Sequence, residues 1–214
     1  MSNKAKNVIE FYVLCNKLKN VIRTGWKDWH VAKDRIESVA EHIYGTQMLA
    51  LAIFSEYQYD IDIFKVIYML AVHELEEIII GDLTQFQISR EEKQKLGHEA
   101  IEKVLSSLSS KEYIKKIIFE FDERKTKEAN FAYHIDKLEW DIQCKIYDEE
   151  KSVDVHDARN RLNFHDPDVE KMLDEGKSWS DMWMTFGQKK YNYDKNFTEI
   201  SNYVKDNKIL SDVK

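Results

Sequence analysis

The scarcity of glycine and proline constrains the fold of this chain more than any other feature of its sequence. Six glycines and one proline occur among 214 residues, whereas Lys, Glu, Leu and Ile are plentiful. Because glycine and proline disfavour the interior of helices and the plentiful residues favour it, this composition indicates helices along almost the whole chain. We therefore predict an all-α protein.

Charge, cysteine usage and hydropathy limit the partners that such a protein can have. The formal net charge is −7, and residues of both signs are mixed, without a basic stripe for a nucleic-acid polymer. A small nucleotide is still possible, because a metal and a few local cations could hold its phosphate. Cys15 and Cys144 are isolated, as in a reducing compartment. Since no apolar run approaches the ~20 residues of a membrane helix, we expect a cytoplasmic protein without a membrane partner.

Apolar periodicity and capping signals predict a succession of helices without internal repeats. Ser38 and Glu41 have the spacing of a capping box, and Asp166-Pro167 has that of another helix start. Residues 22–37 lack a sustained period and are expected to form an irregular loop. The predicted helices span about 5–21, 38–56, 89–108, 111–123 and 126–148, with further segments starting near 166, 178 and 197. Another helix is predicted to begin at Asp60 or Asp62 and to end near Gly81.

The stretch AVHELEEIIIGDLT, residues 71–84, places charges in an apolar run, where they need a partner. Residues i, i+1 and i+4 of a helix project within a limited arc, so His73, Glu74 and Glu77 would share one side. His42 and Asp136 offer matching chemistry from two other predicted helices. Two imidazoles and two carboxylates suit a divalent transition ion, with water in the remaining positions.

Other readings of these residues stay open at the level of the sequence. His42 could be exposed, Glu74 could face solvent, and Asp136 could pair with Lys137 or Lys145. The HExxH motif of metalloproteases is excluded, because position 77 is a glutamate instead of the second histidine.

The order of four motifs resembles the HD-domain metal-dependent phosphohydrolases, and within them the 5'-deoxynucleotidase branch with its pattern H…HD-x-x-E…GD…D. The motifs are R-T-G-W, E-S-V-A-E-H, V-H-E-L-E-E-I-I-I-G-D-L-T and H-I-D-K-L-E. The resemblance extends from about Leu18 to Asp148. It implies an HD-domain-like helical bundle over residues 1–150, followed by a C-terminal helical extension over 151–214 that packs on this core or on a dimer partner.

Carried onto this sequence, the resemblance implies a metal site and an acid–base pair. The implied metal ligands are His42, His73, Glu74 and Asp136, with Glu74 at the position of the family's aspartate. Glutamate keeps the charge and adds roughly 1.5 Å of reach. The implied proton-transfer residues are Glu77 and Asp82, and the implied substrate contacts are Arg23 with the phosphate and Trp26 near the sugar.

The function implied is a metal-dependent phosphoric monoester hydrolase, most simply a 5'-nucleotidase that converts (deoxy)nucleoside 5'-monophosphates to nucleosides and phosphate. Its cofactor would be a divalent Mn, Co, Zn, Fe or Mg ion. The alternatives are a weakened or inactive nucleotide-binding or protein-interaction module, and a phosphodiesterase or triphosphohydrolase. The helical core, the aromatic tail and the resemblance together suggest a homodimer.

Overall fold

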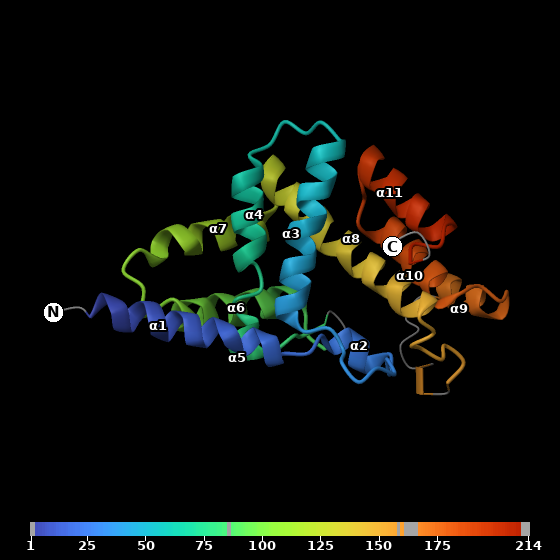
Figure 1. Ribbon diagram of the computed structural model, residues 1–214, viewed down its shortest axis with the longest axis horizontal. Coiled ribbons are helices and arrows are strands. Elements are labelled where there is room, and N and C mark those ends of the chain that lie inside the picture. Colours follow the sequence, from blue (N-terminus) through green and yellow to red (C-terminus); the bar gives the residue numbers. More distant parts are fainter. Residues whose placement is uncertain (1–2, 85–86, 158, 161–166, 211–214) are drawn as a thin grey trace. The chain divides into compact units, whose positions relative to one another are not determined.

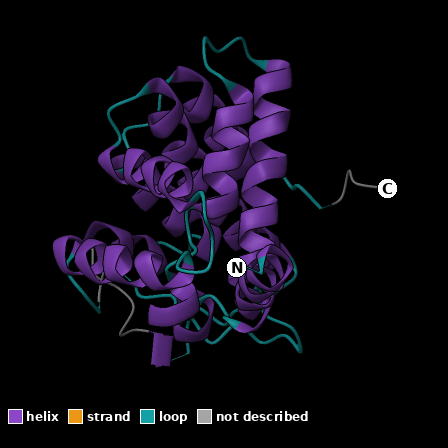
Figure 2. Cartoon of the chain, turned by 90° about the vertical axis from the view of Figure 1, so that its left-hand side faces the viewer, coloured by secondary structure: helices purple, strands orange, loops and turns teal. Residues whose placement is uncertain are grey.

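A computed structural model describes residues 3–84, 87–157, 159–160 and 167–210 (Figure 1). Within these ranges every regular element is a helix, and the one extended pairing is an isolated antiparallel bridge between Ile22 and Ser38 (Figure 2). This confirms the predicted all-α class. Across the same ranges, no helix combines the length and the apolarity needed to cross a bilayer.

Most predicted helices are present, but the one predicted over residues 5–21 is an α-helix only to Cys15 and continues as a 3-10 helix. Helix α9 begins at Pro167, and its predicted cap, Asp166, lies outside the described residues. The helices are α1 (Lys4–Cys15), the 3-10 helix η1 (Asn16–Asn20), α2 (Thr24–Asp28), α3 (Val39–Glu56), α4 (Ile63–Val72), α5 (Glu77–Ile80), α6 (Arg90–Val104), α7 (Lys111–Glu123), α8 (Lys127–Glu149), α9 (Pro167–Asp174), α10 (Trp179–Lys190) and α11 (Lys195–Asp206).

The chain forms two compact units. The first unit comprises Met1–Thr24 and Glu37–Tyr133, and the second comprises Gly25–Ile36 and His134–Lys214. Helix α8 belongs to the first unit up to Tyr133 and to the second from His134 onward. The predicted division near residue 150 concerns the extent of a family domain and stays a prediction.

In the first unit, α3 and α4 pack side by side (Figure 1). The predicted capping box at the start of α3 is confirmed. The Ser38 hydroxyl accepts from the Glu41 N–H at 3.4 Å, and the Glu41 carboxylate accepts from the Ser38 N–H at 2.9 Å. One face of α3 is buried, so His42 in its first turn faces the core. The buried residues of this face are Val39, His42, Thr46, Ala50 and Ile53.

The predicted helix from Asp62 to Gly81 is interrupted. Asp62 caps α4 as expected, with its carboxylate accepting from the backbone N–H groups of Phe64 and Lys65, but α4 ends at Val72. A tight turn then connects it to α5, with backbone bonds three residues apart, such as Glu77 N–H to Glu74 C=O at 3.2 Å. Such 3-10-like turns rotate side chains differently from an α-helix, so the charged residues do not keep α-helical spacing. Gly81 follows α5 with a φ of +73°, which favours glycine.

The core of the second unit is aromatic. Trp26 is completely buried, with its ring centroid 5.4 Å from those of both Tyr147 and Trp183. The prediction of an irregular loop over residues 22–37 is wrong for Thr24–Asp28, which form α2. Residues 25–36 supply two rings of this core, those of Trp26 and Trp29. All five tryptophans of the chain take part: Trp26, Trp29, Trp140, Trp179 and Trp183.

Candidate metal centre

Three of the predicted metal ligands come together within the first unit. His42 lies on α3, His73 caps the C-terminus of α4, and Glu74 follows in the turn. Each offers a ligand atom within 4.8 Å of the others, and all three side chains are buried. The two imidazole centroids lie 5.6 Å apart. A fold in which separate elements converge in this way brings together side chains that the sequence keeps about 30 residues apart.

The tautomer of His73 can be assigned from its surroundings. Its Nδ1 lies 2.8 Å from the Leu70 carbonyl oxygen, which can only accept a hydrogen bond. Nδ1 therefore carries the proton in the neutral ring, and Nε2 carries the lone pair. Nε2 is also the atom nearer the Glu74 carboxylate, at 3.7 Å. A backbone carbonyl that orients the ring through its other nitrogen is the usual arrangement around a metal-binding histidine.

Asp136, the fourth predicted ligand, lies on the part of α8 that belongs to the second unit. The pairing expected in the alternative reading is present, because Lys137 Nζ lies 2.8 Å from Asp136 Oδ2. A carboxylate has two oxygens, so this ion pair and metal ligation are compatible.

Arg23 is buried beside the candidate ligands. Its guanidinium lies 3.7 Å from the Glu74 carboxylate and 4.0 Å from that of Asp82. Burial alone would lower the pKa of Arg23, but the charges of Asp82, Glu74 and Glu77 outweigh it and hold the pKa above its ordinary value. Backbone pairing positions the residue, since the Arg23 N–H donates to the Glu37 carbonyl at 3.0 Å.

Asp82 is fixed by Thr24 through two hydrogen bonds. The Thr24 backbone N–H donates to the Asp82 carboxylate at 2.6 Å, and the Thr24 hydroxyl donates to the Asp82 carbonyl at 2.6 Å. The segment that carries Arg23 is thereby tied to the residue after Gly81. Two predicted functional residues that are far apart in the sequence become neighbours.

Glu77 pairs with Lys93, a residue that the sequence did not single out. Lys93 Nζ donates to Glu77 Oε1 at 3.0 Å. Burial, followed by the charge of Glu74, raises the pKa of Glu77 well above its ordinary value, against the opposing effect of Lys93. Glu76 was also missed, and burial raises its pKa as well. The segment HELEE has three glutamates and no lysine or arginine. This excess of acidic residues was the sequence signal that a cationic side chain from another helix lies beside them.

The group carries more negative than positive side chains. Its carboxylates are Glu74, Glu76, Glu77 and Asp82. Its cations are Arg23 and Lys93, which feel the charges of these carboxylates. Buried carboxylates in excess of their cationic partners are costly unless protonated or bound to a metal. With two imidazoles at hand, the donor set therefore fits a divalent transition ion.

Trp26, predicted near the sugar, lies two residues beyond Thr24 but inside the aromatic core of the second unit. Its ring has no exposed surface. Its contact with a substrate stays a prediction.

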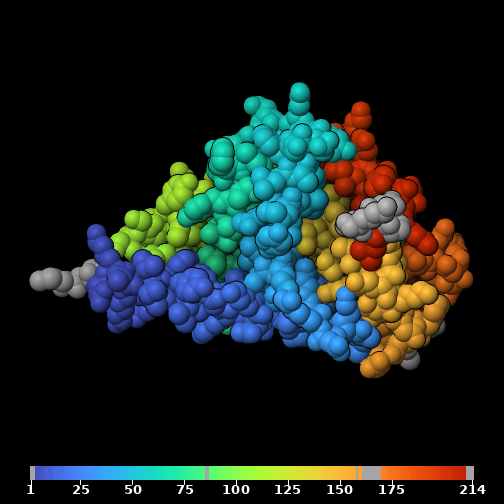
Figure 3. Space-filling model, in the orientation of Figure 1, coloured from blue at the N-terminus to red at the C-terminus, as the bar shows by residue number. Residues whose placement is uncertain are grey.

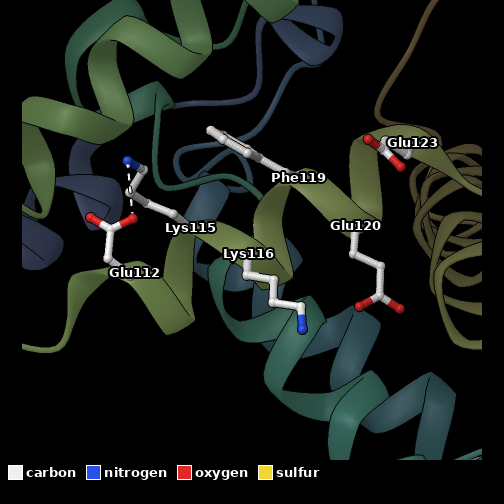
Figure 4. A pocket seen from close by; sticks show the side chains of 6 residues that line it. All are labelled: Glu112, Lys115, Lys116, Phe119, Glu120 and Glu123. Carbon is white, nitrogen blue, oxygen red and sulfur yellow. Dashed lines mark ion pairs between the residues drawn. The ribbon is translucent and has the colours of Figure 1, made fainter.

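A hollow lies along α7, and several of its charged groups form ion pairs (Figure 4). Lys115 pairs with Glu102 and Glu112, and Glu120 pairs with Lys65 at 2.6 Å. The side chains around it are Glu112, Lys115, Lys116, Phe119, Glu120 and Glu123. Ion pairs at the surface of a protein are common and contribute little to stability, so this hollow does not indicate a binding site.

Comparisons with known proteins agree with the resemblance. The sequence model of the HD domain family matches residues 15–175. The 5'-deoxynucleotidase HDDC2 of Dictyostelium discoideum is 33% identical over 73% of this chain and 83% of its own. The 5'-deoxynucleotidase HDDC2 of Homo sapiens is 27% identical over 80% of this chain and 85% of its own.

Solved structures share the fold. A conserved hypothetical protein from Pyrococcus furiosus is 25% identical and matches with a TM-score of 0.58 over 78% of this chain and 97% of its own. A predicted metal-dependent phosphohydrolase from Magnetospirillum magnetotacticum MS-1 is 18% identical, with a TM-score of 0.63 over 95% of this chain and 91% of its own. Because the family's sequence model covers most of the chain, and its relatives match along most of their own length, the chain belongs to the HD domain family.

Proposed function

We propose that the chain is a metal-dependent phosphohydrolase that converts (deoxy)nucleoside 5'-monophosphates to nucleosides and phosphate. The observation that carries the proposal is the buried group of His42, His73 and Glu74, with Arg23 and Glu77 beside it. A site that holds a metal, an arginine and a carboxyl group together has the components that hydrolysis of a phosphate ester needs. The relatives named 5'-deoxynucleotidases support the substrate class.

The residues that would hold the metal are His42, His73, Glu74 and Asp136. A divalent ion bound there would supply positive charge to the phosphate and increase the acidity of the attacking water. The resemblance allows Mn, Co, Zn, Fe or Mg. Two imidazole ligands favour the transition ions over Mg, which prefers oxygen ligands. A set of four protein ligands is most simply occupied by one ion.

Arg23 would bind the substrate phosphate. Its guanidinium is planar and always charged, and can donate two parallel hydrogen bonds to phosphate oxygens. Its separations of 3.7 Å and 4.0 Å from Glu74 and Asp82 are longer than hydrogen bonds. Those carboxylates therefore hold the guanidinium near the metal ligands mainly through charge. Trp26 would act near the sugar, two residues beyond the Thr24 anchor.

Glu77 and Asp82 would carry the proton transfers, one assisting the attacking water and the other the leaving 5'-oxygen. Lys93 would act as a positioning residue, because its ammonium group fixes one oxygen of Glu77 at 3.0 Å. It also lowers the pKa of Glu77 against the effects of burial and Glu74. Thr24 would play the same positioning role for Asp82.

A homodimer is the second part of the proposal. The aromatic tail, one basis for that expectation, contributes to the core of the second unit, where Trp179 is buried. Support comes instead from the apolar outer face of α3, whose large side chains are exposed.

A substrate panel tests the activity. Metal-loaded protein would be assayed for phosphate release from 5'-deoxynucleoside monophosphates, 5'-ribonucleotides, 3'-monophosphates, deoxynucleoside triphosphates and a phosphodiester, with products separated by chromatography. We expect nucleoside and phosphate from the 5'-monophosphates. Release of pyrophosphate or triphosphate would indicate a triphosphohydrolase, and cleavage of the diester would indicate a phosphodiesterase. Chelator-insensitive nucleotide binding without any product would indicate a binding module.

A further inference from the structure

Glu37 is a buried carboxylate that has no part in the proposed chemistry. The residue is 8% exposed, and it directly precedes Ser38, the N-cap of α3. Figure 3 shows the part of α3 that reaches the surface of the first unit, in light blue, and so buried a residue contributes almost nothing to that surface. A carboxylate out of contact with water is costly unless cations or hydrogen-bond donors compensate its charge. Buried groups of the protein must therefore compensate Glu37.

A short extended pairing determines the side on which Glu37 lies. Ile22 and Ser38 form the antiparallel bridge, and beside it the Arg23 N–H donates to the Glu37 carbonyl at 3.0 Å. Residues directly opposite each other in an antiparallel pair place their side chains on the same face. Glu37 therefore lies on the side of Arg23. Burial lowers the pKa of Arg23, but the charges of Asp82 and, to a smaller extent, Glu37 raise it.

The imidazole of His42 is the second group near Glu37. A carboxylate oxygen of Glu37 lies within 4.8 Å of a ring nitrogen of His42, which has no exposed surface. A metal-binding histidine usually donates the N–H of its other ring nitrogen to a carboxylate, a backbone carbonyl or water. The Leu70 carbonyl has this role for His73. Glu37 is placed to have it for His42.

We propose that Glu37 is a positioning residue, whose carboxylate accepts the N–H of one ring nitrogen of His42 and leaves the other nitrogen free to bind the metal. This role rests on the proposed metal site and is independent of the substrate. A negatively charged acceptor makes an imidazole more basic than a neutral carbonyl does, so His42 becomes the stronger donor of the two histidines. Because a carboxylate has two oxygens, Glu37 can face Arg23 at the same time, and it then links a metal ligand to the residue proposed to bind phosphate.

The tautomer of His42 tests this contact without metal or substrate. In the metal-free full chain, with isotope-labelled histidine and at a pH at which the ring is neutral, nitrogen NMR distinguishes the protonated ring nitrogen from the one that carries the lone pair. The signals of His42 are identified by their loss in His42→Gln. We expect a single tautomer of His42 in the wild type. Glu37→Ala should give a mixture of the two tautomers, because the acceptor that selects one of them is removed.

Calorimetric titration of the chelator-treated full chain with Co²⁺ measures the consequence for metal binding. Glu37→Ala should weaken the affinity by about 10- to 100-fold, because the ring loses the partner that orients it, while the number of bound ions stays the same. Glu37→Gln keeps an acceptor oxygen without the charge, and its affinity should lie between those of the alanine variant and the wild type. Glu41→Gln is the matched control. It removes one negative charge from the same end of α3, keeps the capping box, and should bind Co²⁺ as tightly as the wild type.

Three results would overturn the positioning role. The first is an unchanged Co²⁺ affinity in Glu37→Ala, and the second is an equal loss in Glu41→Gln, which would reduce the effect to net charge. The third is weaker Co²⁺ binding with an unchanged tautomer of His42, which would make Glu37 a ligand itself. If Glu37→Ala does not fold, the nearly isosteric Glu37→Gln provides both measurements. If the wild type binds no metal, the proposed function fails, whereas the tautomer still decides whether Glu37 orients His42.

Discussion

The two units of the molecule differ in the side chains that gather in their interiors, although the second unit also buries the carboxylates of Asp136, Glu139 and Asp141. The first unit encloses two imidazoles, several carboxylates, an arginine and a lysine, whereas the second encloses all five tryptophans. Aromatic rings gain free energy from burial itself, but buried charges must be compensated by partners. The comparison teaches that the second unit is built for stability and that the first gives up stability for a group able to bind a cation.

Truncation of the aromatic core should have the largest effect on stability. Trp179→Ala removes a fully buried ring that contacts Trp26, Trp29 and Trp183, and should lower the free energy of unfolding by about 3–5 kcal/mol. Urea unfolding followed by circular dichroism measures it. Trp179→Phe is the control and should lose far less, since Nε1 of Trp179 is buried without a hydrogen-bond partner among the described residues. If the alanine variant lost less than about 1 kcal/mol, the aromatic core would not be a main source of stability in the second unit.

Removal of a predicted ligand should have the largest effect on metal binding. His73→Ala should reduce bound metal to a small fraction of the wild-type stoichiometry, and phosphate release by more than about 100-fold. Replacing a residue that only contacts a metal ligand already reduces metal affinity or activity by about 10- to 100-fold. Elemental analysis after dialysis measures the metal. The matched control is His156→Ala, since His156 is exposed and belongs to the second unit. Equal metal content in both variants would show that His73 is not a ligand.

Lys93 offers a finer test of how the buried acids are compensated. Lys93→Met should lower kcat by about 10- to 100-fold, within the range of general acid–base catalysis. Because Lys93 lowers the pKa of Glu77, its removal should move the limb of the pH–rate profile due to Glu77 to higher pH. Lys93→Arg keeps the positive charge and should keep the limb near its wild-type position. Superimposable profiles for all three proteins would remove Lys93 from the proposed mechanism.

The smallest predicted effect concerns Asp141, a carboxyl group with no exposed surface in the second unit. Burial raises the pKa of Asp141 well above its ordinary value, although Tyr193 donates to its Oδ2 at 3.0 Å. The folded state then binds a proton that the unfolded state releases. The contribution of this proton to the stability of the folded protein is therefore complete below the ordinary pKa of 3.8. It is lost as the pH rises through the pKa of Asp141 in the folded state.

Asp141→Asn should remove this pH dependence and stabilise the protein at pH 8 by about 1 kcal/mol relative to the wild type. Thermal unfolding between pH 5 and pH 9 measures both effects. A wild-type stability that is flat over this range, or an asparagine variant that is less stable at pH 8, would contradict the assignment.

Local sequence signals predicted the helices well. The capping box of Ser38 and Glu41 and the cap at Asp62 depend on residues three apart or fewer, so they could be read directly. The break after Val72 could not be predicted from the periodicity, because Ile63–Ile80 is apolar enough to continue as one helix. The tertiary convergence of His73 and Glu74 with α3 accompanies that break.

The candidate site was predictable to the extent that it depends on motifs. The motif order identified His42, His73 and Glu74, which the first unit brings together. It did not identify Lys93, because the ion pair joins Glu77 to a residue 16 positions away on a different helix. Nor did it predict that the ring of Trp26 lies within an aromatic core, since that core combines residues 26–36 with residues 140–183, which are far apart in the sequence.

Metal reconstitution with activity measurement tests the central claim most directly. Metal-free protein would be reloaded with manganese, cobalt, zinc or magnesium, and phosphate release from deoxy- and ribonucleoside 5'-monophosphates compared for the wild type, Glu74→Asp and Asp136→Ala. We predict turnover by the wild type that a chelator abolishes and that Asp136→Ala lacks. If the wild type released no phosphate and Glu74→Asp did, Glu74 would not be a ligand that supports activity. Silence of both would contradict the enzymatic proposal itself.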